Sequence, residues 1–125
     1  MIRPAIKNLK VIGKNLTGLE IKNDHRIDTC LITDYNKSDM TLINRQININ
    51  FKQIDSIFFD VFADISKKEI NNRYLIALLH EVAHYKQAKK MSLRKWIKES
   101  KNFDISEQKE YIANRYARKY YKLFI

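Results

Sequence analysis

Residues 74–84 read Tyr-Leu-Ile-Ala-Leu-Leu-His-Glu-Val-Ala-His, an apolar run that ends in a short polar motif. The first six residues would make a helix apolar on almost every face, and such a helix belongs in the interior of a protein. Histidine and glutamate side chains are costly to bury unless they have partners. The stretch therefore predicts a buried helix, over roughly 71–90, that carries chemically active side chains into the core.

His80, Glu81 and His84 form the pattern H-E-x-x-H. Four residues are just over one helical turn, so both imidazoles project from the same face with a spacing that suits one zinc ion. Glu81 lies between them, off that face, where it can act as a general base without being a ligand. The competing interpretation is a pair of core histidines that are hydrogen-bonded to backbone carbonyls.

A hydrolytic zinc site needs three protein ligands and one open position. No histidine follows His84, and His25 lies far upstream without a supporting motif, so we expect His25 at the surface. A carboxylate near the C-terminus remains, and Glu110 is the candidate. Glu107 competes with it, although Asp104 and Glu107 resemble a capping box that would place Glu107 at a helix end. Glu110 could instead be a solvated carboxylate paired with a neighbouring lysine or arginine.

The flanking sequence changes from strand-like to helical patterns along the chain. This order predicts an α+β fold with helices packed on one small sheet. We expect one domain over 1–125, with the sheet and the motif helix in a lobe over 1–86 and the glutamate helix in a lobe over 87–125. Turns are expected at Gly13 and Gly18. The expected strands are 9–13, 17–22, 27–33 and 40–51, and the expected helices are 52–66, 71–90, 92–100 and 105–122.

The composition is that of a globular protein, with 45% hydrophobic and 30% charged residues among 125. No apolar run approaches the ~18 residues that span a bilayer, and the N-terminus lacks the apolar segment of a secretory signal. A single cysteine, Cys30, excludes an intramolecular disulfide and favours a reducing compartment. We therefore expect a cytoplasmic protein that makes no membrane contact.

Positive charge is concentrated near the C-terminus. The formal net charge is +10, and residues 85–125 contain 12 Lys and Arg against 4 Asp and Glu. A basic region of this kind can attract nucleic acid or an acidic polypeptide, or it can simply be a solvated helical surface. No nucleic-acid-binding motif accompanies it.

The motif H-E-V-A-H at 80–84, followed by E-Y-I-A-N at 110–114, resembles the gluzincin metallopeptidases. The ImmA/IrrE-type peptidases have a similar pair of motifs, and the short length is most similar to the minigluzincins. The resemblance implies a small zincin-like domain and one Zn²⁺ ion per chain, held by His80, His84 and Glu110. It also implies Glu81 as the general base and Asn114 as the hydrogen-bond partner of a ligating histidine.

The resemblance further implies a peptide or unfolded-protein substrate, paired with an edge strand that we place within residues 40–50. Members of the minigluzincin group are found blocked by their own C-terminal segments. Here the tail over 121–125, or the same tail of a second copy, would cover the site; alternatively, Leu123, Phe124 and Ile125 complete the core of the last helix. The candidates for stabilising the oxyanion are the tyrosines of that last helix. Core packing would equally explain these tyrosines, which are Tyr111, Tyr116, Tyr120 and Tyr121.

The function that these patterns favour is a zinc-dependent endopeptidase. One alternative is a nucleic-acid-binding module with a structural or regulatory zinc ion, and another is a zinc-binding, peptidase-like protein that is held inactive. Closed structural zinc sites use four protein ligands and favour cysteine. A ligand set of two histidines and one glutamate weighs against the structural alternative.

Overall fold

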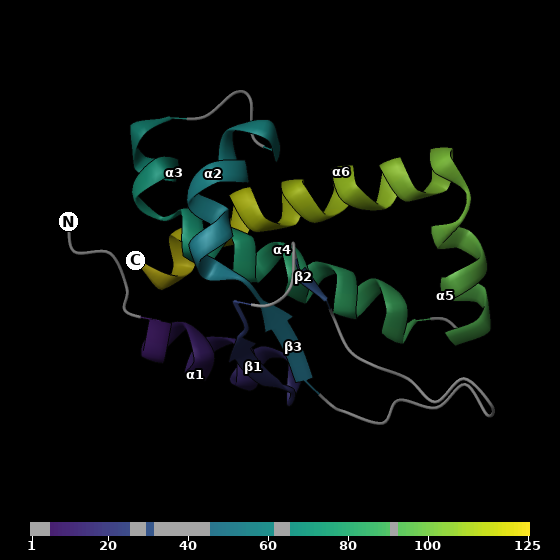
Figure 1. Cartoon of the computed structure of the whole chain (residues 1–125), viewed down its shortest axis with the longest axis horizontal. Helices are drawn as coiled ribbons and strands as arrows, with labels where there is room; N and C mark the ends of the chain where they lie inside the picture. Colours follow the sequence, from purple (N-terminus) through teal and green to yellow (C-terminus); the bar gives the residue numbers. More distant parts are fainter. Residues whose placement is uncertain (1–5, 26–29, 32–45, 62–65, 91–92) are drawn as a thin grey trace.

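Two long helices, α4 (Arg73–Lys89) and α6 (Phe103–Tyr120), pack along each other and frame the fold (Figure 1). The computed structural model describes residues 6–25, 30–31, 46–61, 66–90 and 93–125. Around this pair the described elements are α1 (Ile6–Thr17), β1 (Glu20–Asn23), β2 (Cys30–Leu31), β3 (Gln46–Ile49), α2 (Phe51–Val61), α3 (Lys67–Asn71), α5 (Leu93–Ser100) and the 3₁₀ turn η1 (Tyr121–Phe124).

Helix α4 is the centre of the core, as its apolar sequence predicts. It packs against α1, α2 and α6, so most of its circumference is covered by other helices. It begins at Arg73 because Asn72 ends the short helix α3, with its backbone N–H donating to the Glu69 carbonyl. The prediction of a buried motif helix is confirmed by a run of fully buried side chains: Leu75, Ile76, Leu78, Leu79 and Val82.

The sheet has three strands in the order β1-β3-β2. β1 pairs with β3 in parallel, with Ile21 opposite Ile47, and β2 pairs with β3 antiparallel. Ile21, Ile47 and Ile49 are buried, so one face of the sheet joins the core. The small sheet beside packed helices is compatible with the α+β class, although most of the described residues are helical.

The position of β3 corrects one expectation. The substrate-binding edge strand was placed within residues 40–50, but β3 is the central strand and has a neighbour on each side. Among the described residues, the edges are β1 and β2. Residues 40–45 lie outside the described residues.

The first predicted strand is wrong, because residues 9–13 belong to helix α1. Leu9, Ile12 and Leu16 recur every three or four residues and face the core, which is a helical spacing rather than an alternation. Gly13 is therefore inside a helix instead of a turn. Gly18, at φ +74°, does make the turn into β1, which covers only the end of the predicted 17–22 strand.

Gly13 is required by the close approach of α1 to the sheet and to α4. A Cβ at this position would collide with the side chain of Ile21 and would lie 3.1 Å from Leu78 Cδ1. Alanine gains up to ~1 kcal/mol in helix propensity, whereas overpacking a core costs about 1–3 kcal/mol. We expect Gly13→Ala to lower the free energy of unfolding by about 1–2 kcal/mol.

Denaturant unfolding of Gly13→Ala measures this effect, and Asn15→Ala, at an exposed position of the same helix, is the matched control. A Gly13→Ala protein at least as stable as the wild type would show that α1 can move away from Ile21 at no cost.

The remaining helices lie close to their predicted ranges. Strand 27–33 is represented by β2 alone, and the rest of that range lies outside the described residues. Helix 52–66 is represented by α2; residues 62–65 lie outside the described residues, and Ser66 is the N-cap of α3. Helix α6 starts two residues earlier than predicted, because the Asn102 side chain accepts the Ile105 backbone N–H. The proposed capping box of Asp104 and Glu107 is therefore wrong. No helix within the described ranges is long and apolar enough to cross a membrane.

Candidate metal centre

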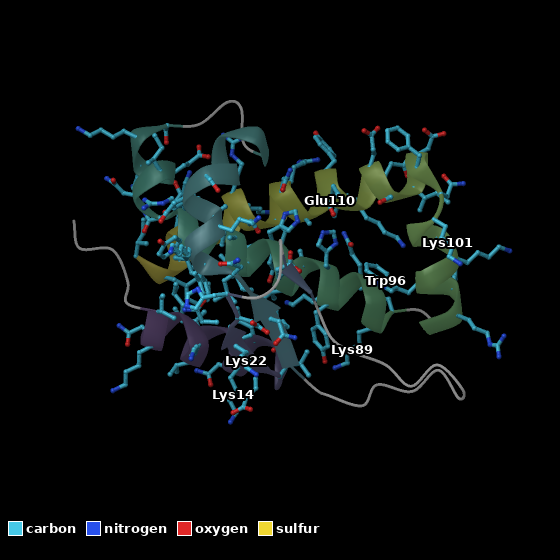
Figure 2. All side chains as sticks on the ribbon, viewed as in Figure 1. Lys14, Lys22, Lys89, Trp96, Lys101 and Glu110 are labelled. Carbon is cyan, nitrogen blue, oxygen red and sulfur yellow. The ribbon has the colours of Figure 1, made fainter. Side chains whose placement is uncertain are left out.

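Three side chains that are separated in the sequence meet between α4 and α6. His80 and His84 lie one turn apart on α4, and Glu110 reaches them from α6. Figure 2 labels Glu110 near the middle of α6. The two imidazole Nε2 atoms are 3.0 Å apart. Glu110 Oε2 is 2.9 Å from His80 Nε2, and Glu110 Oε1 is 2.9 Å from His84 Nε2. The predicted ligand set thus forms one compact cluster.

The close approach of the two helices depends on small residues. Ala113 and Ala117, one and two turns after Glu110, are fully buried at the contact with α4. Larger side chains at these positions would hold the helices apart and would withdraw the Glu110 carboxylate from the imidazoles. The burial of both alanines and the packing of α4 on α6 agree with the predicted close approach.

The cluster is buried on one side and open on the other. The side chains of His80 and His84 are 12% and 8% exposed, whereas that of Glu110 is 55% exposed. Among the described residues, only these three side chains converge as a metal-ligating group. Three ligands with a solvent-facing side are the arrangement of a catalytic zinc site rather than of a closed structural one.

Gln87 holds His84 in place and was not identified as part of the site from the sequence. Its Nε2 donates to the Lys109 carbonyl on α6 at 3.1 Å, which leaves its Oε1 to face His84 Nδ1 at 3.0 Å. An amide oxygen only accepts, so Nδ1 is the protonated nitrogen of His84. Gln87 lies three residues after His84, a spacing that could have indicated this contact.

The position of this proton bears on whether the site fits a metal ion, because it decides which ring nitrogen can be a ligand. With the proton on Nδ1, neutral His84 directs the lone pair of Nε2 toward the Glu110 carboxylate and His80 Nε2. Electron pairs brought this close repel one another unless a proton or a metal cation lies among them. Zinc at its usual ~2.0–2.1 Å bond lengths needs tetrahedral ligand atoms about 3.3 Å apart, so a small outward movement accommodates it. The donor set fits zinc.

The electrostatics of the metal-free cluster agree with this geometry. Burial lowers the pKa of His84, but the hydrogen bond that protonated His84 donates to Glu110 and the charges of Glu81 and Glu110 outweigh burial, so the pKa is raised. Burial raises the pKa of Glu110, but its hydrogen bonds to both histidines hold that pKa well below its usual range. The cluster therefore favours bound positive charge.

Glu81 and Asn114 flank the cluster. Glu81 is buried, and its charge acts on His84. Glu81 therefore lies beside the three clustered side chains but is not one of them. Asn114 Oδ1 and His80 Nδ1 are both buried and lack hydrogen-bond partners among the described residues. The expected hydrogen bond from a ligating imidazole N–H to the Asn114 side-chain oxygen is thus not formed among the described residues.

The four candidate tyrosines occupy different environments. Tyr121 is 2% exposed and belongs to the core. Tyr116 and Tyr120 are partly buried, and their tilted rings contact each other with centres 4.7 Å apart. Tyr111 is exposed, with Arg115 over its ring. Packing therefore accounts for three of the four, and Tyr111 alone is free of the core.

Two other residues weighed from the sequence lie outside the cluster. His25 is exposed in a turn after β1, as expected. Glu107 is exposed on α6, where it lines a surface hollow with Asp104, Gln108 and Tyr111. Glu107 is thus separate from the group that Glu110 forms with the histidines.

The C-terminal tail does not lie over the cluster within one chain. Tyr121 is buried in the core and Phe124 packs against it, whereas Leu123 is 74% exposed. Tyr121 comes eleven residues after Glu110, which is about 16 Å along the helix. The C-terminus lies at the α1 and α3 end of the fold (Figure 1). A block by the tail of a second copy stays a prediction.

Comparisons with known proteins give no match: no family model, no curated protein and no solved structure is similar to this chain.

Proposed function

We propose that this chain is a zinc-dependent peptidase of the gluzincin type. The observation that carries the proposal is the convergence of His80, His84 and Glu110, with their donor atoms about 3 Å apart and one side open to solvent. Two imidazoles and one carboxylate are a known hydrolytic ligand set for zinc.

Glu81 carries the proton transfer in this proposal. When bound, zinc polarises the scissile carbonyl and lowers the pKa of a water molecule to about 7. The Glu81 carboxylate accepts the proton of the attacking water and returns it to the nitrogen of the leaving amine. Its burial beside His84 holds it within the site and keeps bulk water from competing for the proton.

The remaining residues hold the ligands and the substrate. Gln87 fixes the orientation of His84 through Nδ1, which keeps the Nε2 lone pair directed into the cluster. An extended peptide would pair with an edge of the sheet, and β2 is an antiparallel edge among the described strands. Backbone pairing of this kind gives affinity without strong sequence preference.

Two glutamates on α6 test the choice of the third ligand. Glu110 contacts both histidines, whereas Glu107 faces the hollow on the helix surface. We expect Glu110→Ala to weaken zinc binding by at least ~10²-fold, because two imidazoles alone hold zinc poorly. Glu107→Ala, which makes the same change one turn earlier, should bind zinc like the wild type.

Competition with a chromophoric chelator measures both affinities. The reverse order, with Glu107→Ala as the defective variant, would show that the wrong carboxylate has been assigned.

A further inference from the structure

Helix α5 contacts the metal cluster through one aromatic side chain. The ring of Trp96 lies 6.2 Å from the ring of His84, edge to face. Figure 2 labels Trp96 at the end of the α4 and α6 pair where α5 lies. Trp96 is the single tryptophan of the chain, so the intrinsic tryptophan fluorescence reports on this one position.

The Trp96 ring also contacts a buried lysine, Lys109. Lys109 is 9% exposed, and its Nζ lies 4.1 Å from the centre of the Trp96 ring and 3.1 Å from Glu99 Oε1. A buried ammonium group needs such partners, because leaving it without them is strongly unfavourable. The two residues of α5 thus fix the Lys109 side chain between α5 and α6.

Lys109 is connected to the cluster in two ways. It directly precedes Glu110, and its carbonyl accepts the Gln87 hydrogen bond that orients His84. A shift of α6 at Lys109 would therefore move the carboxylate ligand and release the amide that fixes an imidazole ligand.

We infer that Lys109 is a positioning residue for the metal centre, held by Trp96 and Glu99 and acting on His84 through Gln87. This inference rests on the proposed zinc site. It assigns α5 a role in that site, although α5 contributes none of its three ligands.

Substitution of Lys109 tests the inference by zinc affinity. Lys109→Met keeps the aliphatic stem but loses the charge, and it should weaken zinc binding about 10- to 100-fold, the usual effect of removing an outer partner of a ligand. Lys109→Arg keeps the cation over the ring and should stay within about threefold of the wild type. Lys98→Met, at an exposed position of α5, is the matched control and should bind zinc normally.

Two further readouts separate positioning from simple stabilisation. Zinc should change the Trp96 fluorescence of the wild type with the stoichiometry of binding. Because part of the effect of Lys109 runs through Gln87, the losses in Lys109→Met and Gln87→Ala should be less than additive in the double variant. Full additivity, or a Lys109→Met protein that binds zinc like the wild type but melts at a lower temperature, would overturn the inference.

A second variant covers the case in which Lys109→Met does not fold. Glu99→Gln keeps the shape of a partly exposed side chain and removes the charge that faces Lys109 at 3.1 Å and the exposed Lys95 at 3.9 Å. It should weaken zinc binding at least about threefold, and unchanged affinity would overturn the inference. A wild-type chain that binds no zinc would instead overturn the proposed function itself.

Discussion

His84→Ala is expected to abolish stoichiometric zinc binding. In the proposed site His84 supplies one of three ligands, and it is also the imidazole that Gln87 contacts at Nδ1 and that lies beside Trp96. Its loss leaves one imidazole and one carboxylate, so the affinity should fall by at least ~10²-fold and the metal should be lost to a chelator. Metal analysis after dialysis measures the zinc content.

The matched control for this variant is His25→Ala, because His25 is exposed in a turn outside the cluster. His25→Ala should retain about one zinc ion per chain. A folded His84→Ala protein, verified by circular dichroism, that keeps wild-type zinc affinity would show that the metal binds elsewhere.

Glu81→Gln is expected to separate catalysis from metal binding. Glutamine has nearly the shape of glutamate and fits the same buried position, but it accepts no proton from water. The variant should bind zinc like the wild type and lower kcat for a fluorogenic peptide at least ~10²-fold. Glu107→Gln, an exposed change on α6, should leave kcat unchanged.

Full peptide cleavage by Glu81→Gln would assign the proton transfer to another group. A zinc-loaded wild type that cleaves no peptide and no unfolded protein would favour the alternatives, which are an inactive regulator or a nucleic-acid-binding module. The basic C-terminal region makes salt-dependent DNA binding the direct test of the second alternative.

The motif helix could be predicted from the sequence because its evidence is local. The apolar run before His80 requires burial, and the spacing of His80 and His84 requires one shared helix face. Glu110 could be proposed because a third donor was needed and few carboxylates follow the motif. Its contact with both histidines depends on the packing of α4 on α6, which only the structure gives.

The N-terminal third was less predictable. Its apolar residues fit both a loose alternation and a helical spacing, and packing of Leu9 and Gly13 against the core decides for helix α1. The central place of β3 in the sheet was also not readable, because strand order depends on contacts between distant segments. The ligand-orienting contacts of Gln87 and Lys109 likewise arise from tertiary packing.

X-ray absorption spectroscopy of the zinc-loaded chain tests the central claim most directly, since it identifies the ligand atoms around the metal. The account predicts one zinc ion with nitrogen and oxygen ligands at about 2.0–2.1 Å, the multiple-scattering signal of two imidazoles, and no sulfur at about 2.3 Å. A chain that takes up no zinc, or whose zinc shows a sulfur ligand or no imidazole, would contradict it.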